Sequence, residues 1–108
     1  NELENNLLTY KENRKKLLTA LPELGLNKMA SPDGAFYLYI DISEFSSDSY
    51  DFAKKMLDIG GVAITPGIDF DPINGKSKIR ISYARSTSEI LNGIKRIKKF
   101  MDEKRYRH

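Results

Sequence analysis

The stretch GGVAITPGIDFDPINGKSKIRISY, residues 60–83, contains two short runs with β-strand character, separated by a loop rich in Pro, Gly and Asp. The second run, KIRISY at residues 78–83, alternates apolar and polar side chains. Because successive side chains of a strand point to opposite faces, Ile79 and Ile81 should share one face and Arg80 should lie on the other. We therefore expect a half-buried antiparallel strand with one wet, polar face.

Arg80 allows two interpretations. It is either an ordinary residue of the wet face or a fixed clamp for an anion. A guanidinium presents a planar fork that matches a carboxylate in bidentate fashion, and a strand is a rigid support for such a fork. The alternation of side chains does not choose between the two interpretations.

Helices are predicted on both sides of these strands. Residues 2–21 place a stripe of side chains alternately four and three positions apart, which indicates one long amphipathic helix. The stripe consists of Leu3, Leu7, Tyr10, Arg14, Leu17 and Leu21. Pro22 disfavours helical geometry at the preceding residue, so the regular helix should end near residue 20 or 21. A second helix is expected between the candidate caps 46–48 and the glycine pair 60–61.

The last helix is predicted to begin at Ser86, because Ser86 and Glu89 have the spacing of a capping box. Its expected buried stripe is Ile90, Leu91, Ile94, Ile97 and Met101. The polar segment MDEKRYRH, residues 101–108, should fray.

A further strand is predicted over residues 36–42, FYLYIDI, because aromatic and β-branched residues favour sheets. It follows the turn signal Ser31–Gly34, with Pro at the second position and Gly at the fourth. The chain of 108 residues is long enough for one domain. We therefore expect a single α+β domain over residues 1–108, with helices covering one face of a small mixed or antiparallel sheet.

Net charge, cysteine content and the length of apolar runs bear on the possible partners and the cellular location of the protein, but they do not identify its function. The net charge of +3 is mild and does not by itself argue for nucleic acid. The sequence has no cysteine, which excludes thiol chemistry and fits an intracellular, reducing compartment, so we expect a cytoplasmic protein. No apolar run approaches the roughly 20 residues that span a bilayer, and no membrane association is expected.

The basic last helix leaves a second function open. Lys95, Arg96, Lys98 and Lys99 occupy much of the side opposite the apolar stripe. Such a face binds phosphates in some proteins but is usually a solvated surface. The aromatic residues of 36–42 could stack on bases, although aromatics in strands are more often core. The alternative is therefore a free-standing basic α+β module that binds RNA or a protein partner.

Other chemistry is missing from the sequence. It has no phosphate-binding glycine motif, and neither a His-Glu-x-x-His nor a Cys-x-x-Cys motif. The one histidine, His108, is terminal, so Ser/His/Asp catalysis is not expected. We predict no metal site and no catalytic residue in this chain, which leaves Arg80 as the candidate for function.

Four sequence blocks carry a resemblance to a known family. They are Asp33–Tyr37 (DGAFY), Gly61–Gly67 (GVAITPG) with Phe70 three residues on, Ile79–Ala84 (IRISYA) and Gly93–Ile97 (GIKRI). In this order and spacing they closely resemble the C-terminal, small domain of class I/II pyridoxal-phosphate-dependent aminotransferases, which are fold type I proteins related to aspartate aminotransferase. The resemblance covers nearly all of the chain.

The resemblance implies a function and a set of site residues. Aminotransferases of this kind are homodimers of two-domain subunits, and a lysine of the large domain forms a Schiff base with pyridoxal phosphate. The small domain carries an arginine that binds the α-carboxylate of the amino-acid or 2-oxo-acid substrate, and Arg80 matches it. Pro66, Gly67 and Phe70 match the loop near the mouth of the site.

The sequence also departs from the complete family pattern. It contains no Ser-x-x-Lys segment of the kind that carries the cofactor lysine, and no Asp-x-x-Tyr segment of the kind that serves the cofactor ring. The large domain is thus expected to be a separate part of a longer parent chain, docked near Leu3 and Leu7. We expect the 108-residue chain alone to bind no cofactor covalently and to be inactive.

Overall fold

The computed structural model describes residues 2–61 and 64–106 and contains helices and strands of an α+β fold. The helices are α1 (Glu2–Glu23), α2 (Ser49–Lys55) and α3 (Thr87–Tyr106), with a π-helical turn η1 (Met56–Gly60) that continues α2. The strands are β1 (Met29–Ala30), β2 (Tyr37–Asp41), β3 (Thr65–Pro66) and β4 (Lys78–Ser82). Two 3-10 turns, η2 (Gly67–Asp69) and η3 (Gly75–Ser77), lie between β3 and β4.

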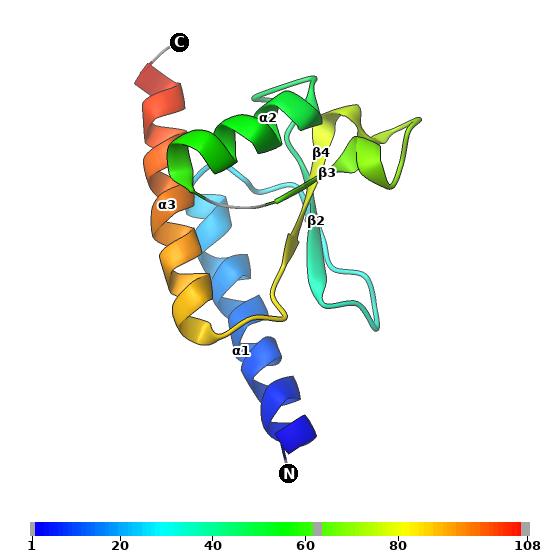
Figure 1. The fold of residues 1–108 in the computed structure, drawn as a ribbon, viewed down its shortest axis with the longest axis vertical. Helices are drawn as coiled ribbons and strands as arrows, with labels where there is room; N and C mark the ends of the chain where they lie inside the picture. Colours follow the sequence, from blue (N-terminus) through cyan, green and yellow to red (C-terminus); the bar gives the residue numbers. More distant parts are fainter. Residues whose placement is uncertain (1, 62–63, 107–108) are drawn as a thin grey trace.

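The strands form one antiparallel sheet in the order β1-β2-β4-β3. Figure 1 shows α1, α2 and α3 on the same side of this sheet, with α1 and α3 packed against each other. The expected α+β class, with helices over one face of a small sheet, is confirmed, and every strand pair in the described residues is antiparallel. The first of the two β-type runs expected within residues 60–83 is VAIT, residues 62–65, of which residues 62 and 63 lie outside the described part of the chain.

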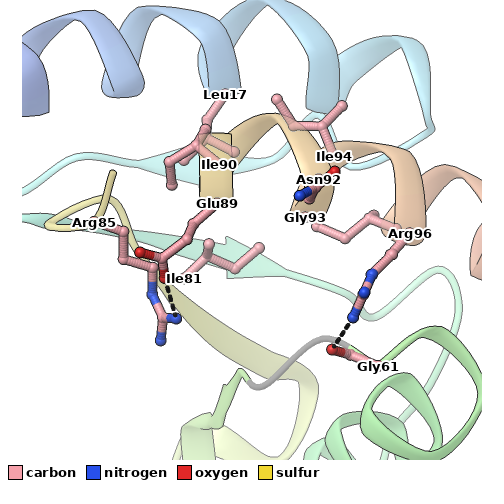
Figure 2. Close-up of a pocket in the computed structure, with 11 residues that line it drawn as sticks. Leu17, Gly61, Ile81, Arg85, Glu89, Ile90, Asn92, Gly93, Ile94 and Arg96 are labelled. Atoms are coloured by element: carbon pink, nitrogen blue, oxygen red, sulfur yellow. Dashed lines mark hydrogen bonds and ion pairs between the residues drawn. The ribbon is translucent and has the colours of Figure 1, made fainter. Parts of the chain in front are cut away.

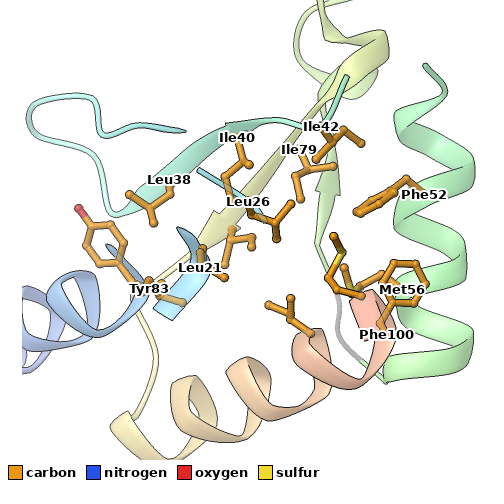
Figure 3. Close-up of a cluster of buried hydrophobic side chains, with 14 of the residues drawn as sticks. Leu21, Leu26, Leu38, Ile40, Ile42, Phe52, Met56, Ile79, Tyr83 and Phe100 are labelled. Atoms are coloured by element: carbon orange, nitrogen blue, oxygen red, sulfur yellow. The ribbon is translucent and has the colours of Figure 1, made fainter. Parts of the chain in front are cut away.

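The core lies between the sheet and the helices (Figure 3). Its largest fully buried side chains include Leu17, Leu21, Leu26, Leu38, Ile40, Ile42, Phe52, Met56, Ile79, Ile97 and Met101. The predicted alternation of the KIRISY run is confirmed, because Ile79 and Ile81 are buried while Arg80 is only half-buried. None of α1, α2 and α3 covers the opposite face of the sheet (Figure 1). The alternation of side chains along β4 places Arg80 on this open face, opposite Ile79 and Ile81.

Two local predictions were off by a few residues. Helix α1 continues to Glu23 and includes Pro22, because Leu21 is fully buried and its packing outweighs the local preference of the proline. In the turn before β2, the backbone hydrogen bond joins Pro32 to Ala35, so that Gly34, at φ +74°, occupies the third position. Glycine takes that left-handed conformation without steric cost.

Helix α3 begins as the capping box predicts. The backbone N–H of Glu89 donates to Ser86 Oγ at 3.2 Å, and Ser86 Oγ donates to Glu89 Oε1 at 3.0 Å. Two side chains of its stripe differ from the prediction, since Leu91 is 46% exposed and Phe100 is buried in its place. The helix also extends to Tyr106, whereas the segment from residue 101 was predicted to fray; His108 lies outside the described residues.

Asn13 ties α1 to the segment between β4 and α3. Its side chain is fully buried and Nδ2 donates to the carbonyls of Tyr83 and Arg85 at 3.1 and 2.7 Å. Its Oδ1 accepts from the hydroxyl of Thr87 at 3.1 Å. This buried amide therefore fixes the position of α1 relative to the start of α3.

Replacing Asn13 with alanine should lower the free energy of unfolding by about 2 kcal/mol, because three hydrogen bonds worth about 0.5–1.5 kcal/mol each are lost and some partners stay buried. Urea unfolding of the two chains measures the difference. Asn6→Ala, on an exposed stretch of the same helix, is the matched control and should stay within about 0.5 kcal/mol. If the Asn13→Ala chain had the same free energy of unfolding as the unchanged chain, the Asn13 amide would not stabilise the contact between α1 and the start of α3.

Candidate functional site

Arg80 lies on β4, an inner strand of the sheet that is hydrogen-bonded to a neighbouring strand on each side. On β4 it is paired with Tyr39 of β2 and with Thr65 of β3. A strand held on both sides is a rigid support, so the direction in which the Arg80 side chain leaves the sheet is set by the ladder. The side chain rises from the open face, away from the apolar core.

Two aromatic rings contact the guanidinium of Arg80. Its Cζ lies 4.8 Å from the ring centroid of Tyr37 and 4.9 Å from that of Phe70. Tyr37 belongs to β2, and Phe70 follows η2 in the loop between β3 and β4. Both distances are within the range in which a cation is attracted to the face of an aromatic ring. The predicted site residues Arg80 and Phe70 therefore lie together.

Arg80 has no acidic partner within the described residues. The ion pairs there join Lys15 to Glu12, Lys28 to Glu44, Lys55 to Asp51 and Arg85 to Glu89. The described hydrogen bonds likewise use none of the Arg80 side-chain donors. The aromatic contacts use the π faces of the rings, so the in-plane N–H groups of Arg80 are left for an external acceptor.

A tight contact between two glycines holds the loop that carries Phe70. A Cβ on Gly67 would lie 2.5 Å from the carbonyl oxygen of Gly75 and 2.6 Å from that of Lys78. The buried hydroxyl of Ser49 donates to the carbonyl of Gly75 at 2.8 Å and accepts from the N–H of Ile68 at 3.4 Å. Gly67 thus shapes the loop by letting η2 and η3 touch through their backbones.

Pro66 forms the transition from β3 into this loop. It pairs with Ile79 of β4 and has φ −66° and ψ 141°, which the proline ring favours. The three predicted loop residues thus follow one another from β3 into the loop beside β4. Phe70 contacts the guanidinium of Arg80, and the backbone of Gly67 packs against the carbonyls of Gly75 and Lys78.

Tyr39 and Lys78 on the sheet lie near Phe70, and two ionisable groups of β2, Tyr39 and Asp41, have shifted pKa values. The ring of Tyr39 lies 5.2 Å from that of Phe70, and Lys78 Nζ lies 5.3 Å from the centroid of Tyr39. Burial and the nearby carboxylate of Asp71 raise the pKa of the Tyr39 phenol above its ordinary value. Hydrogen bonds from Ser43 lower the pKa of the Asp41 carboxyl at the end of β2.

A cavity of about 260 Å³ lies elsewhere, on the helix side of the sheet (Figure 2). Ile81 lines it, and Ile81 and Arg80 point to opposite faces of β4. At its rim Arg85 pairs with Glu89 at 3.6 Å, and Arg96 donates to the carbonyl of Gly61 at 3.1 Å. This cavity is therefore separate from the site around Arg80.

A second cavity, of about 270 Å³, lies between α1 and the turn before β2. It is lined by Leu7, Tyr10, Arg14 and Phe36 among others. Arg14 Nε donates to Ser31 Oγ at 2.8 Å across it. Leu7 is 44% exposed and Leu8 63% exposed, so this end of α1 presents apolar surface; the side chain of Leu3 lies outside the described residues.

Neither a membrane-spanning helix nor a metal site is found among the described residues. Among the described residues, none of the helices is both long and apolar enough to cross a membrane. No group of three acidic, histidine or cysteine side chains within the described ranges could hold a metal ion. The basic residues Lys95, Arg96, Lys98 and Lys99 of α3 are exposed, as a solvated face would be.

Comparison with known proteins places this geometry in a family. The family model described as aminotransferase class I and II matches residues 1–97. The chain belongs to the class I and II aminotransferases. It is 47% identical over 96 residues to a valine–pyruvate aminotransferase of Mycobacterium tuberculosis, a match that covers 89% of this chain and 25% of that protein.

Solved structures of aminotransferases share the fold. An aminotransferase from Mycobacterium tuberculosis superposes with a TM-score of 0.90 at 44% identity, covering 94% of this chain and 26% of that one. An aromatic aminotransferase from Pyrococcus horikoshii OT3 superposes with a TM-score of 0.82 at 31% identity, covering 90% and 25%. This chain therefore spans about a quarter of the length of the aminotransferases it matches.

Sequence reasoning missed one side chain of this candidate site. The sequence analysis places Tyr37 in an aromatic strand and in the DGAFY block but gives it no role at Arg80, yet its ring contacts Arg80. Strand alternation could have indicated that Tyr37 lies on the same face of the sheet as Arg80. The residue directly opposite Arg80 on β2 is Tyr39, however, whereas Tyr37 is paired with Ser82 and reaches Arg80 diagonally. A diagonal contact depends on strand register, which a single sequence does not provide.

Proposed function

We propose that this chain is the C-terminal, small domain of a pyridoxal-phosphate-dependent aminotransferase and that Arg80 binds the α-carboxylate of the substrate. The full-length protein transfers an amino group from an amino acid to a 2-oxo acid. One observation carries the proposal. In a member of this family, Arg80 rises from a rigid strand with its guanidinium against aromatic rings and without an acidic partner in the described residues.

The chemistry of the arginine fits this role. A guanidinium offers two parallel N–H groups to the two oxygens of a carboxylate, which fixes the orientation of the acid as well as its position. Holding the carboxylate orients the neighbouring Cα–H bond of the amino acid relative to the cofactor, an effect of proximity and orientation. Pyridoxal phosphate, when bound, supplies the electron sink for the bond that breaks.

The remaining site residues support Arg80. We assign Pro66, Gly67 and Phe70 to the loop that shapes the mouth of the site, with Phe70 in direct contact with the guanidinium. No residue of this chain is assigned to the cofactor. The cationic side chains that the open face offers near the loop, Lys78 and Arg80, both lie against aromatic rings, and the sequence lacks the Ser-x-x-Lys segment expected of a cofactor lysine.

The partners of this domain follow from the same proposal. The large domain of the full-length chain holds the cofactor and docks against the first part of α1, at Leu3 and Leu7. Leu7 and its neighbour Leu8 are exposed, and Leu7 lines one cavity with the exposed Phe36. Exposed apolar side chains that cluster on one surface favour such a contact. The full-length protein is a homodimer located in the cytoplasm.

The proposed function is tested by measuring 2-oxo-acid formation from a panel of the common amino acids, with pyruvate or 2-oxoglutarate as acceptor. The full-length protein with pyridoxal phosphate should transfer an amino group from at least one donor. The 108-residue chain supplied with the same cofactor should transfer none and show no saturable change in cofactor absorbance. Transfer by the short chain, or no transfer by the full-length protein with any donor, would contradict the proposal.

A further inference from the structure

Two rings from separate elements meet at Arg80. Tyr37 comes from β2 and Phe70 from the loop after η2, and each lies within 5 Å of the guanidinium Cζ, at 4.8 and 4.9 Å. Among the aromatic pairs of the described residues, Tyr37 and Phe70 do not pair with each other. The guanidinium is therefore the group that links the two rings.

The two rings are themselves held in place. Tyr37 extends from a strand that pairs with β4 over five residue pairs, from Tyr37–Ser82 to Asp41–Lys78. Phe70 packs on the ring of Tyr39 at 5.2 Å, at an interplanar angle of 60°. The loop of Phe70 is fixed in turn by the contact between the backbones of Gly67 and Gly75. The guanidinium of Arg80 thus contacts two rings that are themselves fixed, Tyr37 by the strand pairing of β2 and Phe70 by the packing of its loop.

The energetic consequence concerns the flexible arginine side chain. A free arginine populates many rotamers, and fixing it when a ligand binds costs about 1.5–2 kcal/mol of conformational entropy. A side chain already held by contacts in the free protein avoids much of that cost, which is the general advantage of preorganisation. Contacts with ring faces are suited to this purpose because they leave the in-plane N–H donors unused.

We propose that Tyr37 and Phe70 are positioning residues that hold the guanidinium of Arg80 in the orientation that accepts a substrate carboxylate. The inference rests on the proposed function of Arg80 and adds Tyr37, a residue outside the loop that shapes the site. Neither ring needs to touch the substrate. The phenol oxygen of Tyr37 is not required, because the contact is made through the face of the ring.

The test compares kinetic constants of four variants of the full-length protein: Tyr37→Leu, Phe70→Leu, Tyr37→Phe and Tyr50→Leu. Each leucine variant at Tyr37 or Phe70 should raise KM for the amino acid by about 3- to 30-fold, the range of a cation–π contact, with kcat changed much less. Tyr37→Phe keeps the ring and should stay within about twofold of the original KM. Tyr50, 62% exposed on α2, is the matched control and should be unaffected.

A second measurement separates positioning from a structural effect. The penalty should disappear with a primary amine that has the same side chain as the substrate but lacks the carboxylate, because that amine does not use Arg80. Melting temperatures of the variants should stay close to that of the unchanged protein. Phe70 is 37% exposed and lies outside the core, so Phe70→Leu should fold normally. It therefore tests the positioning role even if Tyr37→Leu folds poorly.

The outcomes distinguish this inference from the function on which it rests. Unchanged KM in both leucine variants, together with a severe loss in Arg80→Ala, would overturn the positioning role and leave the proposed function intact. An equal penalty on the amine without a carboxylate would also overturn it. Unchanged kinetics in Arg80→Ala would instead remove the proposed function itself.

Discussion

Replacing Arg80 with alanine in the full-length protein is expected to lower kcat/KM for the amino-acid substrate by about 30- to several-thousand-fold. The range corresponds to the roughly 2–5 kcal/mol lost when one partner of a buried, hydrogen-bonded charge pair is removed. The loss should be severe because the carboxylate then has no bidentate partner, and the amino acid is poorly oriented as well as poorly bound. Steady-state kinetics over a range of substrate concentrations measures it.

Two further variants sharpen this prediction. Arg80→Lys keeps the charge but not the planar fork, so it should recover only part of the lost kcat/KM. Arg85→Ala is the matched control, because Arg85 is an exposed arginine whose side chain pairs with Glu89 at 3.6 Å on the surface. An exposed ion pair of this kind contributes about 0–1 kcal/mol to stability, and its loss should leave kinetics unchanged. Full activity of Arg80→Lys would mean that charge alone suffices and that the fork has no role.

Replacing Gly75 with alanine is expected to lower the free energy of unfolding by about 3 kcal/mol or more. The added Cβ would lie 2.2 Å from the carbonyl oxygen of Gly67, 2.3 Å from its carbonyl carbon and 2.7 Å from the N–H nitrogen of Ile68. All three are backbone atoms, which cannot turn aside as the end of a side chain can. Overpacking commonly costs about 1–3 kcal/mol, and a backbone clash belongs at the upper end or beyond.

Urea unfolding of the Gly75→Ala chain provides the measurement, and Gly93→Ala provides the matched control. A Cβ on Gly93 meets nothing within 4 Å, and Gly93 lies inside α3, so alanine there should stabilise the chain by about 0.5–1 kcal/mol. The loop with Phe70 depends on the Gly75 contact, so the Gly75→Ala change should also disturb the site. An unaltered unfolding free energy for Gly75→Ala would show that the loop relaxes freely.

The sheet around Arg80 was predictable because its signal is local. Alternation over the KIRISY run places Ile79 and Arg80 on opposite faces, and the structure has Ile79 fully buried with Arg80 on the open face. The capping box at Ser86 likewise involves residues three apart and was found where predicted. Such features depend on neighbours in the sequence, so composition and spacing suffice to recognise them.

Features that depend on distant parts of the chain were not predictable in the same way. Asn13 looks like one more polar residue of an amphipathic helix, yet it is fully buried because its partners lie 70 to 74 residues away. The close backbone contact between Gly67 and Gly75 could not be predicted from the sequence either, because glycine is common in loops for reasons of local backbone conformation. Leu91 was expected in the buried stripe of α3 but is exposed, and Phe100, which the predicted stripe did not include, is buried, because the elements that α3 packs against set the direction of the stripe.

Binding of the substrate carboxylate by the guanidinium of Arg80 is tested most directly by a crystal structure. The structure should be that of the full-length protein with pyridoxal phosphate and an unreactive 2-methyl amino acid bound. We predict both carboxylate oxygens at about 2.7–2.9 Å from guanidinium nitrogens of Arg80, the range of charge-assisted hydrogen bonds. A carboxylate bound by other residues, with Arg80 still against Tyr37 and Phe70 and out of its reach, would contradict the account.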